Sequence, residues 1–472
     1  MQRFKTYGIV AVICLVLVCG CAPQVSKIEE RAVSGKPNII YVLVDDLGYG
    51  DLGCYGQQLL QTPNIDRLAA EGVRFTNHYA GCSASSSSRG SLMTGLHTGH
   101  AFIRGDYDIE PEGQLALPAR GETLATVLKR AGYSTAVIGE WGLGWPTSSG
   151  EPLKQGFDYF YGYNCTRMAK NHYPEYLWRN NEKVLVAGNQ DDEKGTYSQS
   201  LLIDEALKFV EDNSKGPFFL YLPLNTPSAS IEAPAELVDE MAGKFGDELP
   251  FEAPLASGLA SQPAPKAAFA AMIKLLDDDM GRILAKLDEL GISGNTIVMF
   301  SSDNGAHADG GHSPDDFNST GGLRGAKASF YEGGLKVPFI VRWPGVAKQG
   351  SVCDKISAQW DILPMFSEIT SQRLLATTDG ISLVSDLSGV PSPRHDNLYW
   401  EYKKGSIQAI RRGDWKAIRY ILKDTVELYN LARDPGEISD LSARYPAIAD
   451  KLAGQMDIEH KASEEFPLPI DQ

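Results

Sequence analysis

The stretch Asn38-Ile-Ile-Tyr-Val-Leu-Val44, followed directly by Asp45-Asp46, decides the fold of this 472-residue chain. An almost uninterrupted apolar run is typical of a strand buried on both faces, as in a parallel sheet. Open α/β sheets bind ligands at the carboxyl edge, where this strand places two adjacent carboxylates. The pair indicates a site for a hard cation, although the dipeptide alone fits a solvated turn equally well.

The same arrangement recurs further along the chain. An apolar run at residues 296–301 leads into Ser302-Asp303-Asn304-Gly305. Asp-Asn-Gly alone is commonly only a turn. Two strands that each end in a pair of oxygen ligands are a stronger signal, and three carboxylates with one amide suit Ca²⁺, or alternatively Mg²⁺, better than Zn²⁺.

Strand and helix patterns alternate between these two runs and predict the fold class. We expect an α/β protein with a large, mainly parallel sheet and helices on both faces. The predicted helices lie at residues 62–71, 123–131, 198–211 and 264–290, and the predicted strands at residues 38–44, 135–138, 217–222 and 296–301.

The character of the sequence changes near residue 385, where short segments separated by turn residues begin. They predict a smaller antiparallel sheet, and an amphipathic helix at residues 447–458 is expected to cover one of its faces. We therefore divide the mature chain into an α/β domain at residues 37–385 and an α+β subdomain at residues 386–472.

The first residues predict export. Arg3 and Lys5 precede a short apolar run that ends in Cys19-Gly20-Cys21, which resembles a bacterial lipoprotein signal at residues 1–21. We expect lipid on Cys21, a tether at residues 22–36, and anchoring in the periplasm or at the outer membrane or cell surface; the alternative is plain secretion with a free Cys21. The formal charge of -16 argues against nonspecific binding to nucleic acid.

A serine-rich segment, Cys82-Ser-Ala-Ser-Ser-Ser-Ser-Arg89, supplies the third signal. It runs into a predicted helix that begins near Ser88. Helix N-termini bind anions and activate nucleophiles, so this segment is a candidate anion site, although a serine-rich stretch alone is commonly a flexible loop.

Five motifs in this order resemble the type I sulfatases of the alkaline phosphatase superfamily. They are residues 38–51, Thr62-Pro-Asn-Ile-Asp-Arg-Leu68, Ser88-Arg89 with Leu92-Met-Thr-Gly95, Ser302-Asp-Asn-Gly305 and Tyr331-Glu-Gly-Gly-Leu-Lys-Val-Pro338. The resemblance covers nearly the whole mature chain. It implies the sulfatase fold and a divalent-metal site, and as substrate a sulfated glycan or a small sulfate ester.

The resemblance also implies roles for individual residues. Sulfatases carry a formylglycine whose hydrate attacks sulfur, and Ser85, four residues before Arg89, stands at its position; a serine-type maturase would have to oxidise it. The implied metal ligands are Asp45, Asp46, Ser85, Asp303 and Asn304, and the implied catalytic residues are Ser85, Arg89 and Lys327. His307, near the metal loop, is a further catalytic candidate for proton transfer, and the alternative is a structural or surface histidine.

Four positions depart from the family pattern and suggest a degraded active site. Ser87 replaces the proline or alanine of the maturation motif, Gly142 replaces a histidine, and Ser228 replaces a histidine that serves the leaving group. Glu140 stands where a lysine contacts sulfate, and at about 4 Å such a charge reversal costs up to several kcal/mol of sulfate binding.

Three functions remain open from the sequence. The first is an active, calcium-dependent sulfatase or arylsulfatase with formylglycine at Ser85. The second is a catalytically impaired pseudosulfatase that binds a glycan or a protein partner. The third, which the sequence favours least, is a phosphoester hydrolase that uses Ser85 directly with the metal.

Overall fold

Strand β1 (Asn38–Val44) is at the centre of a ten-stranded sheet in the computed structural model, which describes residues 1–2, 35–255 and 257–471. The strand order is β11-β2-β10-β9-β1-β8-β4-β5-β6-β7. The five strands β9, β1, β8, β4 and β5 run parallel to one another. The outer pairs β10–β9, β10–β2, β5–β6 and β6–β7 are antiparallel. The predicted fold class is confirmed.

The nine other strands of this sheet are short and, near the centre, almost wholly buried. Their bounds are β2 (Val73–Phe75), β4 (Ser134–Glu140), β5 (Tyr159–Tyr163), β6 (Tyr176–Arg179), β7 (Glu182–Leu185), β8 (Phe218–Leu224), β9 (Thr296–Ser302), β10 (Phe339–Arg342) and β11 (Ser351–Cys353).

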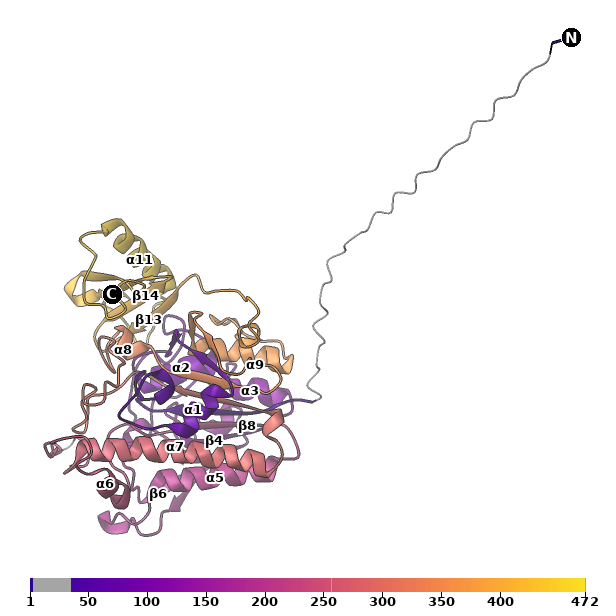
Figure 1. The fold of residues 1–472 in the computed structure, drawn as a ribbon. Coiled ribbons are helices and arrows are strands. Elements are labelled where there is room, and N and C mark those ends of the chain that lie inside the picture. Colours follow the sequence, from indigo (N-terminus) through magenta and orange to yellow (C-terminus); the bar gives the residue numbers. More distant parts are fainter. Residues whose placement is uncertain (3–34, 256, 472) are drawn as a thin grey trace.

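Each face of β1 belongs to a different hydrophobic core, which explains its continuous apolar sequence. Side chains alternate along a strand. One set, residues 40, 42 and 44, packs with α1 (Pro63–Ala70), α5 (Ser198–Asn213) and α7 (Pro265–Glu289). Helices α5 and α7 lie along the lower side of the body in Figure 1. The other set, residues 39, 41 and 43, packs with α2 (Ser85–Thr94), α3 (Leu124–Arg130) and α9 (Ile362–Thr370).

The C-terminal strands form a separate four-stranded antiparallel sheet, as predicted, beside the large sheet (yellow in Figure 1). Its members are β13 (Leu398–Tyr402), β14 (Ile407–Arg412), β15 (Trp415–Tyr420) and β16 (Thr425–Asn430). Helix α11 (Pro446–Glu459) covers one face through Leu452 and Met456. The other face packs on the α/β body, where the Trp400 indole donates to the Ala80 carbonyl at 2.9 Å.

Several short elements are not predicted by sequence pattern, because too few residues repeat for a period to show. They are β3 (His78–Tyr79), β12 (Ser357–Ala358), α4 (Thr166–Ala169), α6 (Ala235–Met241), α8 (Glu332–Leu335) and α10 (Val384–Leu387). Helix α2 begins at Ser85, three residues before the predicted start. Serine is a weak helix former, but tertiary contacts bury this whole turn and outweigh propensity.

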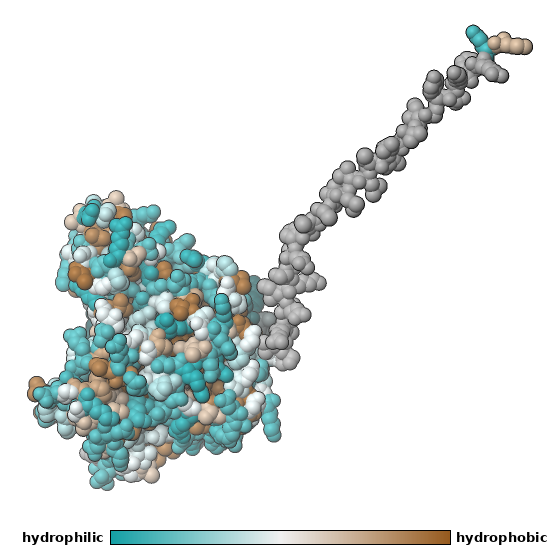
Figure 2. All heavy atoms as spheres, in the orientation of Figure 1, coloured by the Kyte–Doolittle hydropathy of each residue, from teal (hydrophilic) through white to brown (hydrophobic). Residues whose placement is uncertain are grey.

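The predicted signal peptide, Cys21 and most of the tether lie outside the described residues. Within the described part of the chain, no helix has the length and apolarity needed to cross a membrane. The face seen in Figure 2 is mainly hydrophilic, with apolar residues in small scattered patches.

A loop directly after Asp46 is held rigid by Asp51. Its carboxylate accepts a hydrogen bond from the Gly48 amide at 2.7 Å, and the Gly50 amide donates to the Ser319 carbonyl at 2.7 Å. Burial raises the pKa of Asp51 from 3.8 to about 7, against the opposing effect of these hydrogen bonds.

Asp51 predicts a pH dependence of stability. Because the folded state holds its proton more tightly than the unfolded state, this contribution to stability is lost as pH rises from about 4 to about 7. Asp51→Asn keeps the acceptor oxygen, so its stability relative to the wild type should rise by about 2 to 4 kcal/mol over that interval. Urea unfolding at several pH values measures this, with the exposed Asp108→Asn as control. Parallel curves for wild type and variant would contradict it.

Candidate functional site

Strand register brings the predicted acidic residues together. Val44 pairs with Ser302 in the parallel strands β1 and β9, so Asp45 and Asp303 follow side by side. Carboxylate oxygens of Asp45, Asp46 and Asp303 all lie within 4.8 Å of one another, and all three residues are buried. Three carboxylates this close repel one another unless positive charge lies between or beside them.

Asn304 completes the predicted set of four. Its amide nitrogen donates to Asp46 Oδ1 at 2.6 Å, while its buried Oδ1 has no hydrogen-bond partner among the described residues. A buried amide oxygen without a partner is costly, and a hard cation would satisfy it. The donor set therefore fits a divalent cation of the calcium or magnesium type, which would supply positive charge to this edge of the sheet.

Ser85 occupies the first turn of α2 and faces the acidic cluster. Its hydroxyl donates to Asp45 Oδ1 at 2.8 Å. The helix N-terminus directs backbone N–H groups and partial positive charge toward this position. Cys82, by contrast, has a buried thiol next to the Glu401 carbonyl, and burial raises its pKa to about 12. Ser85, and not the nearby cysteine, is presented to the site.

Two cations border the cluster. Arg89, one turn after Ser85, is fully buried, with its guanidinium 3.2 Å from both Asp45 Oδ1 and Asp303 Oδ2. Lys327 Nζ lies 2.7 Å from the Asp46 carboxylate. The side chain of Lys327 is 27% exposed, so it is the cation that can still meet a molecule from solvent.

These contacts shift the protonation equilibria in opposite directions. Burial would raise the pKa of Asp45, but Lys327 and Arg89 outweigh it and lower that pKa below its usual value. Burial and the Asp45 charge hold the pKa of Asp303 well above its usual range. Against its own burial, Lys327 has a strongly raised pKa because Asp46 and Asp45 stabilise its charge. The cluster thus gathers more negative charge than its two cations neutralise.

Comparison with known families assigns this arrangement. A family model described as Sulfatase matches residues 37–371, which include every residue of the cluster. The chain belongs to the sulfatase family. A second model, described as the C-terminal part of N-sulphoglucosamine sulphohydrolase, matches residues 326–462 of this sulfatase-family chain.

Individual known proteins are similar to this chain over most of their own length. The N-acetylgalactosamine-6-O-sulfatase of Bacteroides thetaiotaomicron is 28% identical over 93% of this chain and 96% of its own. An arylsulfatase of Hemicentrotus pulcherrimus is 31% identical over 82% of this chain and 68% of its own. A solved structure from a study of glycosaminoglycan metabolism by Bacteroides thetaiotaomicron superimposes with a TM-score of 0.73 at 25% identity, covering 90% of this chain and all of the other.

Glu140, where the sulfatase resemblance leads us to expect a lysine, lies inside the cluster. It is the last residue of β4, is 1% exposed, and has Oε2 3.5 Å from the Arg89 guanidinium. Neither carboxylate oxygen has a hydrogen-bond partner among the described residues. Burial raises the pKa of Glu140 to about 8, with the Asp45 charge adding to the rise and Arg89 opposing it. The charge reversal predicted from sequence assumed a fully ionised Glu140; this pKa makes it weaker near neutral pH.

Gly142, where the sulfatase resemblance leads us to expect a histidine, is closely surrounded by its neighbours. Its φ of +72° favours glycine, and an added Cβ would lie 3.3 Å from Gln114 Oε1 and 3.4 Å from the Thr166 methyl. Gln114 donates to both Thr166 Oγ1 and Ser86 Oγ, at 2.8 and 2.7 Å. Gln114 and Thr166 therefore occupy the space beside Gly142, and nothing in their local sequence indicated it.

Ser228, the third departure, does reach the site. Its hydroxyl donates to Asp46 Oδ2 at 2.5 Å. Behind it, the buried His172 approaches the Ser228 carbonyl at 3.4 Å, and burial lowers the pKa of that imidazole. His172 is a site neighbour that the sequence did not reveal, since a single histidine in a loop carries no pattern.

His307 lies close to the cluster, but the geometry does not favour the predicted proton transfer. Its Nε2 contacts the Pro227 carbonyl at 3.1 Å, and its Nδ1 accepts a hydrogen bond from the Asp309 amide at 3.1 Å. Both ring nitrogens are therefore engaged by backbone. His312, with both nitrogens buried and lacking partners among the described residues, stacks on Phe269 at 3.8 Å.

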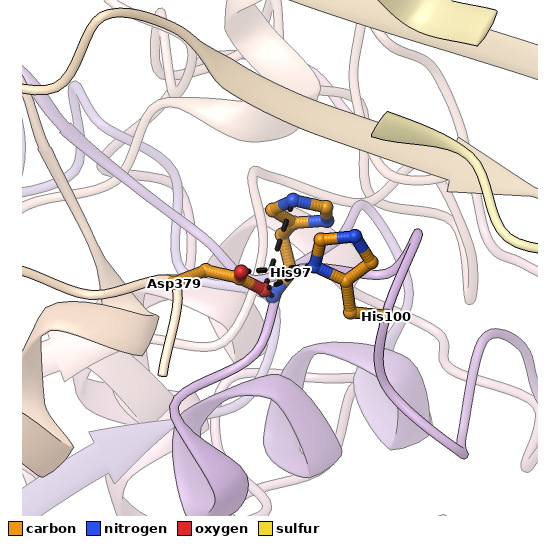
Figure 3. Close-up of side chains that lie close together, drawn as sticks. All are labelled: His97, His100 and Asp379. Carbon is orange, nitrogen blue, oxygen red and sulfur yellow. Dashed lines mark hydrogen bonds and ion pairs between the residues drawn. The ribbon is translucent and has the colours of Figure 1, made fainter. Parts of the chain in front are cut away.

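A second group with metal-ligand side chains lies elsewhere, at the junction with the C-terminal subdomain. Figure 3 shows the imidazoles of His97 and His100 next to each other, with the Asp379 carboxylate beside both. The Gly99 amide donates to His97 Nδ1, which places the proton on Nε2, 3.5 Å from Glu459. The two rings stack at 4.2 Å and His100 pairs with Asp379 at 2.9 Å. These contacts favour an ion-pair cluster over shared metal coordination.

Metal removal tests the acidic cluster. Calcium that binds only the folded state should raise the melting temperature. At a free calcium concentration 100 times the dissociation constant, it should stabilise the folded state by about 2.7 kcal/mol. Chelation should reverse this, and Asp303→Asn should abolish most of the calcium-dependent shift. Differential scanning calorimetry makes the measurement, with the exposed Asp309→Asn from the same loop as matched control. Equal calcium shifts in the two variants would contradict the assignment.

Proposed function

We propose that this chain is a calcium-dependent hydrolase of sulfate esters that acts through a formylglycine at Ser85. The observation that supports it most is the position of Ser85, at a helix N-terminus with its hydroxyl 2.8 Å from Asp45 and with Arg89 one turn away. Oxidation of this side chain would remove two hydrogen atoms, and hydration of the aldehyde would give the attacking hydroxyl.

The residues around Ser85 have roles in this proposal. Asp45, Asp46, Asp303 and Asn304 would hold the calcium ion, which supplies charge to bind sulfate oxygens. Arg89 fixes Asp45 and Asp303 relative to Ser85, and Lys327, being partly exposed, meets the incoming sulfate. The attack would form a bond from the hydrate oxygen to sulfur and break the bond from sulfur to the ester oxygen, and the proton that the attacking hydroxyl loses would pass through solvent to the leaving oxygen. Loss of the proton from the second hydroxyl of the hydrate would then re-form the aldehyde and release sulfate.

A sulfated carbohydrate is the proposed substrate class. The support is that the similar relatives include N-acetylgalactosamine-6-sulfatases. We further propose that a lipid on Cys21 anchors the enzyme outside the cytoplasm, where such glycans occur. The support there is the sequence of the first residues alone.

The second candidate function is a pseudosulfatase that binds a glycan or protein without turnover. Glu140 favours it, because this buried carboxylate lies 3.5 Å from Arg89 and competes with an anion for that charge. Four carboxylates then face two cations, so even a bound divalent ion would only balance the site. The hydroxyl of Ser228 cannot act as an acid near neutral pH.

Direct attack by an unmodified Ser85 on a phosphoester is less favoured by the geometry. The only proton acceptor that the described residues give its hydroxyl is Asp45. The pKa of Asp45 is lowered by Lys327 and Arg89 against the effect of burial, so this carboxylate is a weak base.

Maturation can be tested on the polypeptide itself. Coexpression with an anaerobic serine-type maturase should remove two hydrogen atoms from the peptide that contains Ser85, because the first turn of α2 presents that side chain to the site. Peptide mass spectrometry measures the change, and Ser87→Ala, which restores the family motif, should raise the converted fraction. Ser88→Ala is the adjacent control. An unchanged Ser85 in both wild type and Ser87→Ala would exclude the formylglycine route.

Sulfate binding tests Glu140. Glu140→Gln keeps the shape of the side chain but removes the charge that Glu140 carries above about pH 8. At about pH 9, Arg89 should therefore become available to an anion and affinity for inorganic sulfate should rise on the order of tenfold, while near pH 6 wild type and variant should bind sulfate alike. Isothermal titration calorimetry with calcium present makes the measurement. Glu122→Gln, at a buried carboxylate paired with Arg130 far from the cluster, is the control. Unchanged or weaker binding would show that Glu140 does not oppose the anion.

A further inference from the structure

Loop 101–107 reaches the first turn of α2 from outside the acidic cluster. The Ser86 amide donates to Asp106 Oδ1 at 3.1 Å, so this exposed carboxylate lies beside the residue that follows Ser85. Tyr402, at the end of β13, is buried and faces the same group, and burial followed by the Asp106 charge raises its pKa. Asp106 is therefore held against the first turn of α2, one residue from Ser85.

The loop itself is held from the C-terminal subdomain. Arg104 Nη1 forms an ion pair with Glu401 Oε1 at 2.7 Å and also donates to the Lys461 carbonyl at 2.5 Å. Gly105 packs under the ring of Phe466, which an added Cβ would approach to 3.2 Å. The loop thus depends on β13 and on the chain after α11, rather than on the α/β body alone.

Glu401 is a shared group with two cationic neighbours. The Glu401 side chain is buried, at 1% exposure. Its Oε1 accepts a hydrogen bond from Arg104, and its Oε2 accepts hydrogen bonds from the Tyr399 hydroxyl and from His460 Nδ1, both at 2.7 Å. The other nitrogen of His460 lies 2.7 Å from Asp471 Oδ1. Two carboxylate acceptors on one imidazole require two N–H donors, which only the protonated ring provides.

We propose that protonated His460 is a positioning residue for the first turn of α2, which carries Ser85: through Glu401 and Arg104 it fixes the loop that holds Asp106 against the Ser86 amide. The role rests on the proposed function, because it concerns the turn that carries Ser85. His460 lies at the end of α11 and joins Glu401 of β13 to Asp471 of η7 (Pro469–Asp471). Loss of the ring proton would remove one of the two N–H donors, so that His460 could no longer hold Glu401 and Asp471 together, and this would loosen the loop.

The direction of the pH effect follows from these partners. The hydrogen bond to Glu401 raises the pKa of His460 more than burial lowers it. The hydrogen bond to Asp471 adds to this rise, so the pKa lies above 6.5. The charged groups that face this network are Glu401, Asp471 and Arg104. A histidine with a raised folded-state pKa contributes its stability fully below about 6.5, and that contribution is lost as pH rises through the folded-state value.

Hydrogen–deuterium exchange of the full chain tests the relay without requiring catalysis. Peptides covering residues 101–107 should be protected in the wild type at about pH 6 and lose protection toward about pH 9, after correction for intrinsic exchange, on the order of tenfold. His460→Gln, which cannot be protonated, should show the weaker protection at every pH. Peptides from α7 report whether each variant is folded.

His395→Gln is the matched control, because this histidine pairs with Asp361 at 2.8 Å at the same junction but makes no recorded contact with loop 101–107. It should behave like the wild type. Equal protection of residues 101–107 in wild type and His460→Gln at all pH values would overturn the proposal. If the enzyme proves active, His460→Gln should raise KM and leave kcat unchanged; if no turnover is found, the exchange result still decides the relay.

Discussion

Repulsion among Asp45, Asp46 and Asp303 is the constraint on which the rest of the site depends. Parallel pairing of β1 with β9 forces these carboxylates into contact, and the surrounding hydrophobic cores exclude the water that would otherwise screen them. Burial of several like charges is tolerated only with compensating cations and hydrogen bonds. Arg89 and Lys327 supply part of that compensation, and the free oxygen of Asn304 indicates where a divalent ion would supply more.

Departures from the sulfatase pattern gather at this same point. Glu140 adds a carboxylate that a sulfate ion would have to approach, and its raised pKa moderates that cost by favouring the protonated form near neutral pH. Ser228 donates a hydrogen bond to Asp46. The arrangement therefore fits a divalent cation and also holds a fourth acidic side chain beside Arg89, a combination that is compatible with slow turnover and with binding alone.

Much of the fold and the acidic cluster could be predicted from sequence, because local sequence patterns specify both. The apolar run before Asp45 and the one before Asp303 specify buried parallel strands, and parallel strands deliver their ends to one edge. The residues that sequence missed, such as Gln114, His172 and Asp106, act through contacts between distant segments. Such contacts leave no periodicity or spacing in the local sequence. The same is true of the pairing of Glu140 with Arg89, because it depends on how β4 is aligned with its neighbours in the sheet.

Turnover by the matured protein tests the central claim most directly. The calcium-loaded chain, with formylglycine at Ser85 verified by mass, would be incubated with 6-O-sulfated N-acetylgalactosamine and related sulfated sugars, and free sulfate measured by ion chromatography. The proposed function predicts many sulfate ions released per enzyme molecule from at least one of these sugars, and none by the Ser85→Ala variant. Sulfate release no greater than that of Ser85→Ala from a fully converted, calcium-bound protein across the panel would contradict it and leave the pseudosulfatase as the better account.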